Sequence, residues 1–135
     1  MTISSFDDLI AAAHMQEARQ RLLFVFTNAE LPDESTASMR QAFEAGHGGA
    51  LVPVMCVDKT PEELPAFQML VDEAQQFGQT WSMVFVTTMS GSNASAPDSA
   101  AAEKPLQSMV EAIKAGDIRN MIPFDRNGQA VMLSS

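Results

Sequence analysis

The chain has 135 residues, of which 46% are hydrophobic, and its 8 Lys and Arg against 17 Asp and Glu give a formal net charge of -9 at pH 7. This length fits a single domain that buries one hydrophobic core. The negative charge argues against nucleic acid as a partner, because an acidic protein and a polyanion repel each other.

The sequence also argues against a membrane-bound or exported protein. Its apolar stretches, such as "ALVPVMCV", are far shorter than the roughly 18 residues of a membrane span. Its start, "MTISSFDDLI", has no basic segment of the kind found in signal peptides. Cys56 is the only cysteine, which excludes an internal disulfide. We therefore expect a cytoplasmic protein that does not bind membranes.

The first predicted elements are a helix, a buried strand and a second helix. Ser5 is a suitable N-cap for a helix within "SSFDDLIAAAHMQEARQ", where apolar residues recur at helical spacing. The apolar run Leu22–Phe26 is too short for a helix and predicts a strand covered on both faces. After a turn at Pro32 and Asp33, "DESTASMRQAFEAG" predicts a second helix, which Gly46 ends.

A second strand and a third helix follow. The segment "GALVPVMCVDK" predicts a strand that ends near Asp58, with Pro53 at a strand start or a bulge, because proline cannot donate a ladder hydrogen bond. In "TPEE", Thr60 is a candidate N-cap and the Glu63 carboxylate is placed to accept from the Thr60 amide. This capping box predicts a helix that begins at Thr60 and ends at Gly78.

The last third of the chain predicts a strand, a helix and a hairpin. The apolar run "WSMVFVTTM" is typical of a strand, and "PLQSMVEAIKAG" predicts a helix that Gly116 ends. The ending "NMIPFDRNGQAVML" predicts a β-hairpin. A two-residue turn at Asn127 and Gly128 places Phe124 opposite Val131.

These elements predict the fold class. Strands that alternate with helices are typical of right-handed crossover connections and of a parallel sheet. We therefore predict a single α/β domain over residues 1–135, with a mostly parallel sheet in three layers, helices on both faces and a C-terminal β-hairpin.

The segment "SGSNASAPDSAAAEK", residues 90–104, lies where many nucleotide-binding proteins hold phosphates. A phosphate loop needs several glycines, and a Lys followed by Ser or Thr at the helix start. This segment has Gly91 alone, and Lys104 is followed by Pro105. The composition predicts a flexible loop, with a lid over a neighbouring site as the alternative.

Histidine and cysteine also favour structural interpretations. His14 and His47 lie on separate segments, without the spacing of metal ligands, so we predict no metal and no cofactor. The glycines of "GHGG" around His47 suit a helix end and a short link. Cys56 has apolar neighbours and is predicted to be a small core residue, not a nucleophile.

The predicted sheet brings polar side chains to one edge, because parallel α/β sheets bind ligands at the carboxyl ends of their strands. No catalytic residue is assigned to this edge. The candidate ligand-binding residues there are Asn28, Asp58, Lys59, Thr87, Thr88 and Ser90. The alternative is that these residues are polar only because strand ends meet water.

Three segments carry a resemblance to a known family: "RLLFVFTNAELPDE", "FEAGHGGALVPVMCVDKTPEEL" and "MVEAIKAGDIRNMIPFDRNG". They are similar to small proteobacterial proteins of about this length, commonly labelled "ribonucleotide reductase subunit alpha". The label implies a radical cysteine, a reducing cysteine pair and a tyrosine relay. The chain has one cysteine and no tyrosine, so the resemblance transfers no reductase activity and no catalytic residue.

Two classes of function follow. The preferred one is a non-catalytic accessory or protein-interaction domain with an unknown protein partner. Self-association as a homo-oligomer, through an edge strand of the hairpin or an apolar helix face, is one route. The alternative is a small-molecule-binding protein or a small enzyme with its site at the strand ends. A concave pocket at those ends distinguishes the second class from the first.

Overall fold

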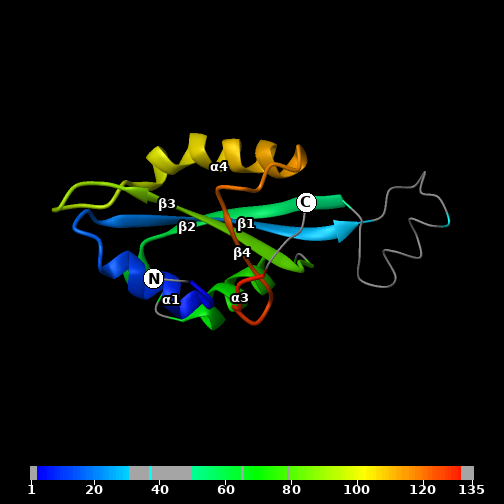
Figure 1. The fold of residues 1–135 in the computed structure, drawn as a ribbon, viewed down its shortest axis with the longest axis horizontal. Helices are drawn as coiled ribbons and strands as arrows, with labels where there is room; N and C mark the ends of the chain where they lie inside the picture. The colour runs from blue at the N-terminus through cyan, green and yellow to red at the C-terminus, as the bar shows by residue number, and fades with distance from the viewer. Residues whose placement is uncertain (1–2, 31–36, 38–49, 65, 79, 132–135) are drawn as a thin grey trace.

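The computed structural model describes residues 3–30, 37, 50–64, 66–78 and 80–131 (Figure 1). Apart from residue 37, the predicted helix over residues 33–46 lies outside the described residues, as do the "GHGG" segment and His47. No helix of the described part has the length and apolar character needed to cross a membrane. The elements are α1 (Phe6–His14), β1 (Gln20–Glu30), β2 (Ala50–Lys59), the 3-10 helix η1 (Pro61–Glu63), α3 (Phe67–Gln76), β3 (Met83–Ser90), α4 (Ser99–Lys114) and β4 (Ile122–Phe124).

The prediction of a mostly parallel sheet is wrong. The four strands lie in the order β2-β1-β3-β4, and every neighbouring pair is antiparallel. Because β2 and β3 are both antiparallel to β1, they run parallel to each other, as expected for two strands joined through a helix. However, β1 lies between them. The alternation of strands and helices along the chain does not reveal that another strand is inserted between two strands joined through a helix.

Helices cover both faces of this sheet (Figure 1). The alternating side chains of β1 explain why. Leu22, Phe24 and Phe26 pack with α1 and α3, whereas Leu23 and Val25 pack with α4. All five side chains are buried. The strand Leu22–Phe26 predicted to be covered on both faces is therefore found at the centre of the molecule.

Local sequence signals explain where the helices begin. Ser5 Oγ accepts a hydrogen bond from the Asp8 amide at 3.3 Å, which caps α1 as predicted. Asp98 Oδ1 accepts from the Ala101 amide at 2.8 Å and caps α4. Consequently α4 begins at Ser99, and residues 99–104 of the predicted loop are helical.

The helix predicted from Thr60 to Gly78 is divided in two. Glu63 Oε1 accepts from the Thr60 amide at 3.0 Å, so the predicted reach-back contact is present. It starts only the short η1, after which the backbone leaves the helical conformation at Leu64 and α3 begins at Phe67. The capping box therefore determines a turn rather than a long helix.

The predicted C-terminal hairpin has a different turn and a register shifted by one residue. The Asp125 amide donates to the Gln129 carbonyl at 2.9 Å, and Phe124 bridges Ala130 rather than Val131. The loop thus holds three residues instead of two and ends on Gly128, at a φ of 78°. This is the turn geometry in which a type I turn is followed by a left-handed glycine.

Gly128 also allows two segments to approach closely. Its carbonyl accepts from the Phe6 amide at 2.7 Å, and a Cβ built on it meets the Phe67 ring at 3.0 Å. Gly116 has a similar φ of 79°, but nothing lies within 4 Å of its Cβ position. A side chain at Gly116 would therefore meet backbone strain alone, whereas a side chain at Gly128 would meet both backbone strain and a steric contact.

We expect Gly116→Ala to lower the free energy of unfolding by about 1 kcal/mol, the cost of a left-handed side chain. Gly128→Ala should cost this amount and about 1 to 3 kcal/mol more, because the phenylalanine ring must move. Equilibrium denaturation of both variants measures the difference. Equal losses would show that the C-terminal turn does not pack against α3.

Candidate functional site

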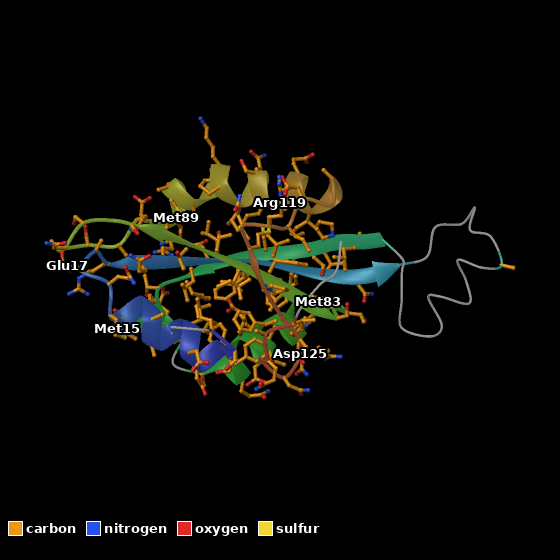
Figure 2. The ribbon with its side chains drawn as sticks, viewed as in Figure 1. Met15, Glu17, Met83, Met89, Arg119 and Asp125 are labelled. Carbon is orange, nitrogen blue, oxygen red and sulfur yellow. The ribbon has the colours of Figure 1, made fainter. Side chains whose placement is uncertain are left out.

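The six predicted site residues do not meet at one edge of the sheet. Because β1 is antiparallel to β2 and β3, its C-terminal end lies opposite theirs. Asn28 is near the end of the sheet where Figure 2 labels Met83, and the other five are near the end where it labels Met89. The parallel arrangement that would have collected all six is absent from the described sheet.

Strand register separates the remaining residues between two faces. Asp58 and Thr87 are both opposite Leu23, on the face covered by α4. Lys59 and Thr88 lie on the other face, toward α1 and α3. Side chains on opposite faces of a sheet cannot line one pocket.

Asp58 is the centre of a polar cluster beneath the start of α4. Its Oδ2 forms an ion pair with Arg21 Nη1 and accepts a hydrogen bond from Ser99 Oγ at 2.7 Å. The Arg21 side chain is 12% exposed and that of Asp58 18% exposed. Arg21 Nε donates to the Pro97 carbonyl. The cluster therefore joins the start of α4 to two strands.

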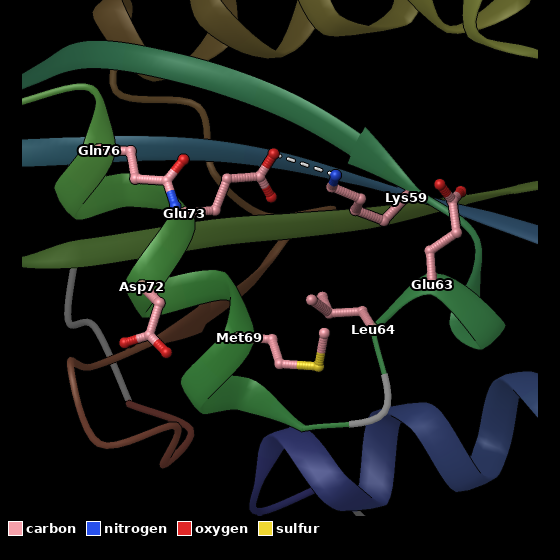
Figure 3. Close-up of a pocket in the computed structure, with 7 residues that line it drawn as sticks. All are labelled: Lys59, Glu63, Leu64, Met69, Asp72, Glu73 and Gln76. Atoms are coloured by element: carbon pink, nitrogen blue, oxygen red, sulfur yellow. Dashed lines mark ion pairs between the residues drawn. The ribbon is translucent and has the colours of Figure 1, made fainter.

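Lys59 forms a separate ion pair on the other face, with 3.0 Å between its Nζ and Glu73 Oε1. The pair lies at an open hollow of about 370 Å³ between β2 and α3 (Figure 3). The residues that line the hollow are Lys59, Glu63, Leu64, Met69, Asp72, Glu73 and Gln76. Three carboxylates accompany a single lysine that is already paired, so the hollow is unsuited to an anionic ligand.

The hydroxyl groups at the strand ends also have partners within the protein or face water. Thr87 Oγ1 contacts Met109 Sδ at 3.3 Å, and Ser90 Oγ accepts from Gln20 Nε2 at 2.9 Å. Thr88 is exposed. No buried side-chain nitrogen or oxygen of the described residues is left without a hydrogen bond. No polar group at these strand ends therefore requires a ligand to satisfy it.

The connection between β3 and α4 is held by backbone hydrogen bonds. The Arg19 amide donates to the Ser92 carbonyl at 2.9 Å, and the Gly91 amide donates to the Arg19 carbonyl at 2.8 Å. A Cβ on Gly91 would lie 2.3 Å from the Ser95 oxygen. The glycine permits this close turn, and its amide is already used, so the connection does not offer a phosphate cradle.

Metal-binding chemistry has no support among the described residues, where no three His, Cys, Asp or Glu side chains are grouped to hold an ion. His14 lines a second hollow, of about 240 Å³, together with Glu17, Arg19 and Glu62. Arg19 and Glu62 form an exposed ion pair across it at 3.9 Å. This hollow is a solvated gap between charged surface side chains.

The edge of the sheet formed by β4 is covered, although the sequence analysis named an edge strand of the hairpin as one route of self-association. Beyond β4, the Val131 amide donates to the Pro123 carbonyl at 3.0 Å. The next segment is paired in turn, because the Ala130 amide donates to the Ser4 carbonyl and Gln129 bridges Ser5. Two successive segments therefore protect this edge.

The opposite edge, formed by β2, has no further strand beside it among the described residues. Cys56 was predicted to be a buried core residue, but it is exposed, because β2 is an edge strand and not an interior one. The flanking side chains of Met55 and Val57 are only partly buried, whereas their register partners in β1, Phe26 and Phe24, are 0% exposed. This edge is apolar and incompletely covered.

Sequence reasoning missed both Arg21 and the exposed edge. Arg21 stands directly before the apolar run Leu22–Phe26, and its charge beside a buried strand was the available signal. The available signal for the exposed edge was Pro53, because proline inside a sheet is confined to edge strands, strand starts and bulges. The apolar run alone reads the same in an interior strand and an edge strand.

Comparison of the chain with protein-family models, with curated proteins and with solved structures gave no significant match.

We expect Arg21→Met to lower the free energy of unfolding by about 2 to 4 kcal/mol, because it leaves the largely buried Asp58 carboxylate without its counter-charge. The control is Arg119→Met, since Arg119 forms an exposed ion pair with Asp117 at 3.0 Å. That variant should unfold like the parent protein in a denaturant titration. Equal stabilities of the two variants would show that the Arg21–Asp58 ion pair does not stabilise the fold.

The Glu63 carboxylate should contribute to the free energy of unfolding in a way that depends on pH. The hydrogen bond from the Thr60 amide lowers the pKa of Glu63 below its ordinary value of 4.5. Its contribution is therefore present above that pH and is lost as the pH falls through the lower, folded-state pKa. Glu63→Gln should make stability depend less steeply on pH as the pH falls below about 5. Thermal unfolding at several pH values, with Glu62→Gln as control, measures this change.

Proposed function

We propose that the chain is a non-catalytic protein-interaction domain, which binds a partner by adding an extended strand to the outer edge of β2, where the described residues place no neighbouring strand. The proposal rests on the contrast between the two edges of the sheet. Two further segments cover β4, while β2 presents ten residues of strand with no described neighbour on its outer side. A long apolar edge is a template for strand addition.

The side chains of β2 support this proposal. Leu51 packs on the core beneath α4, while Val54, Met55 and Val57 pack on the core beside α1 and α3, and all four are only partly buried. An added strand would bury apolar surface on both faces and pair the outward amides and carbonyls. Burial and backbone pairing would therefore act together.

The polar strand ends support a structural role in place of a small-molecule site. Asp58 is occupied by Arg21 and Ser99, and Lys59 by Glu73. The hollow beside Lys59 is open and lined with carboxylates, not enclosed and apolar as ligand pockets usually are. Membership of the family that the sequence resembles, and a cytoplasmic location, remain predictions within this proposal.

The proposal predicts binding of an extended peptide to β2. The probe is a synthetic peptide with the β2 sequence "ALVPVMCVDK", in which Ser replaces the cysteine. We expect saturable binding that slows hydrogen exchange at β2 amides, because those amides become paired. Hydrogen-exchange mass spectrometry at low protein concentration measures this protection.

Three control peptides, one scrambled and two N-methylated, distinguish strand addition from nonspecific binding. A scrambled peptide retains the composition, and peptides N-methylated at alternate residues lose one row of donors while they keep their side chains. Only one of the two N-methylated rows should abolish binding, since alternate amides point to opposite sides of a strand. Equal binding of all the peptides, or protection outside β2, would contradict strand addition.

A further inference from the structure

We infer that the partner at this edge is a second copy of the chain, paired β2 to β2 in antiparallel orientation about a two-fold axis perpendicular to the sheet. The inference rests on the proposed function and specifies its partner. Two-fold pairs use the same surface on both copies, so a strand edge that pairs antiparallel with itself satisfies this symmetry. The result is a continuous sheet of eight strands.

The layers of the molecule favour a second copy over an isolated peptide strand. A two-fold axis perpendicular to the sheet keeps each face on its own side. The α4 helices of both copies would therefore lie on one face, and the α1 and α3 helices on the other (Figure 1). The partly buried side chains on both faces of β2 then gain neighbours from matching helical layers. A lone peptide would cover these side chains only with its own side chains, without a further helical layer on either face.

The charge along the edge also fits a second copy. Each copy carries a net charge of -9, so contact is favourable only where acidic groups do not meet. Residues 50–57 of β2 carry no charge. Asp58 and Lys59 are compensated within their own copy, by Arg21 and Glu73. Antiparallel pairing places this charged end opposite the neutral end of the partner's strand.

The structure indicates the register of the pair. In two-fold antiparallel pairing, one residue lies on the axis opposite itself. Centring on Met55 places Lys59 opposite Leu51 of the second copy and pairs nine residues within β2. Centring on Val54 pairs the same number of residues. In that arrangement, however, the two-fold axis passes through the irregularity in the β1–β2 pairing, which lies between the pairs Phe26–Met55 and Thr27–Pro53. The Met55 register is therefore the one we test.

The first experiment is sedimentation of the full chain at about 0.05 M and about 0.5 M salt. We expect a dimer that becomes tighter at the higher salt, because screening weakens repulsion between two acidic copies. Cys56→Lys should yield a folded monomer, since a charge on an edge strand is a natural block to pairing. It also reduces the net negative charge, so greater repulsion cannot explain the loss. Cys56→Ser should remain a dimer.

The second experiment tests the register by thiol cross-linking with a short bifunctional maleimide. Met55→Cys combined with Cys56→Ser should give a covalent dimer, because the two introduced thiols face each other at the axis. Val52→Cys combined with Cys56→Ser should not, since its two thiols lie about 20 Å apart along the paired strands. The opposite pattern, or equal cross-linking of both, would overturn the register.

The outcomes separate this inference from the proposed function. A monomer at all concentrations that still binds the β2 peptide would overturn the homodimer and leave strand addition intact. A dimer that persists in Cys56→Lys, together with no peptide binding, would overturn both. A dimer that weakens at high salt would contradict the apolar edge and indicate a charge-driven interface elsewhere.

Discussion

The fold depends on the burial of β1 on both faces at the centre of an antiparallel sheet. Five consecutive apolar residues, Leu22–Phe26, supply side chains to both cores. Such a strand needs a helical layer above and below, because neither face tolerates water. It also needs a strand on each side, which β2 and β3 provide. The positions of α1, α3 and α4 follow from this requirement.

The central position of β1 also determines where functional groups lie. By separating β2 from β3, it replaces a parallel strand-end crevice with an antiparallel sheet whose polar ends are divided between two faces. On one face, Asp58 joins Arg21 and Ser99, and on the other Lys59 joins Glu73. These groups stabilise contacts between layers. The same arrangement leaves β2 as the outer strand.

The two edges of the described sheet differ in the segments that lie beside them. The turn ending at Gly128 returns the chain along β4, where it meets Ser4 and Ser5. No described segment returns along β2. Within the described part of the chain, the two edges therefore differ in how far neighbouring segments cover them.

Most elements could be predicted from the sequence because their signals are local. The continuous apolar run Leu22–Phe26, the Ser5 cap and the glycine stops act over a few residues. Strand neighbours and the hairpin register could not, because these depend on packing between distant segments. The sequence by itself thus determined the acidic charge and the approximate places of most described helices and strands, although α3 and α4 begin elsewhere than predicted. Only the tertiary structure decided that β1 lies between β2 and β3, that Asp58 meets Arg21, and that Cys56 lies at an open edge, because each results from contacts between residues far apart in the chain.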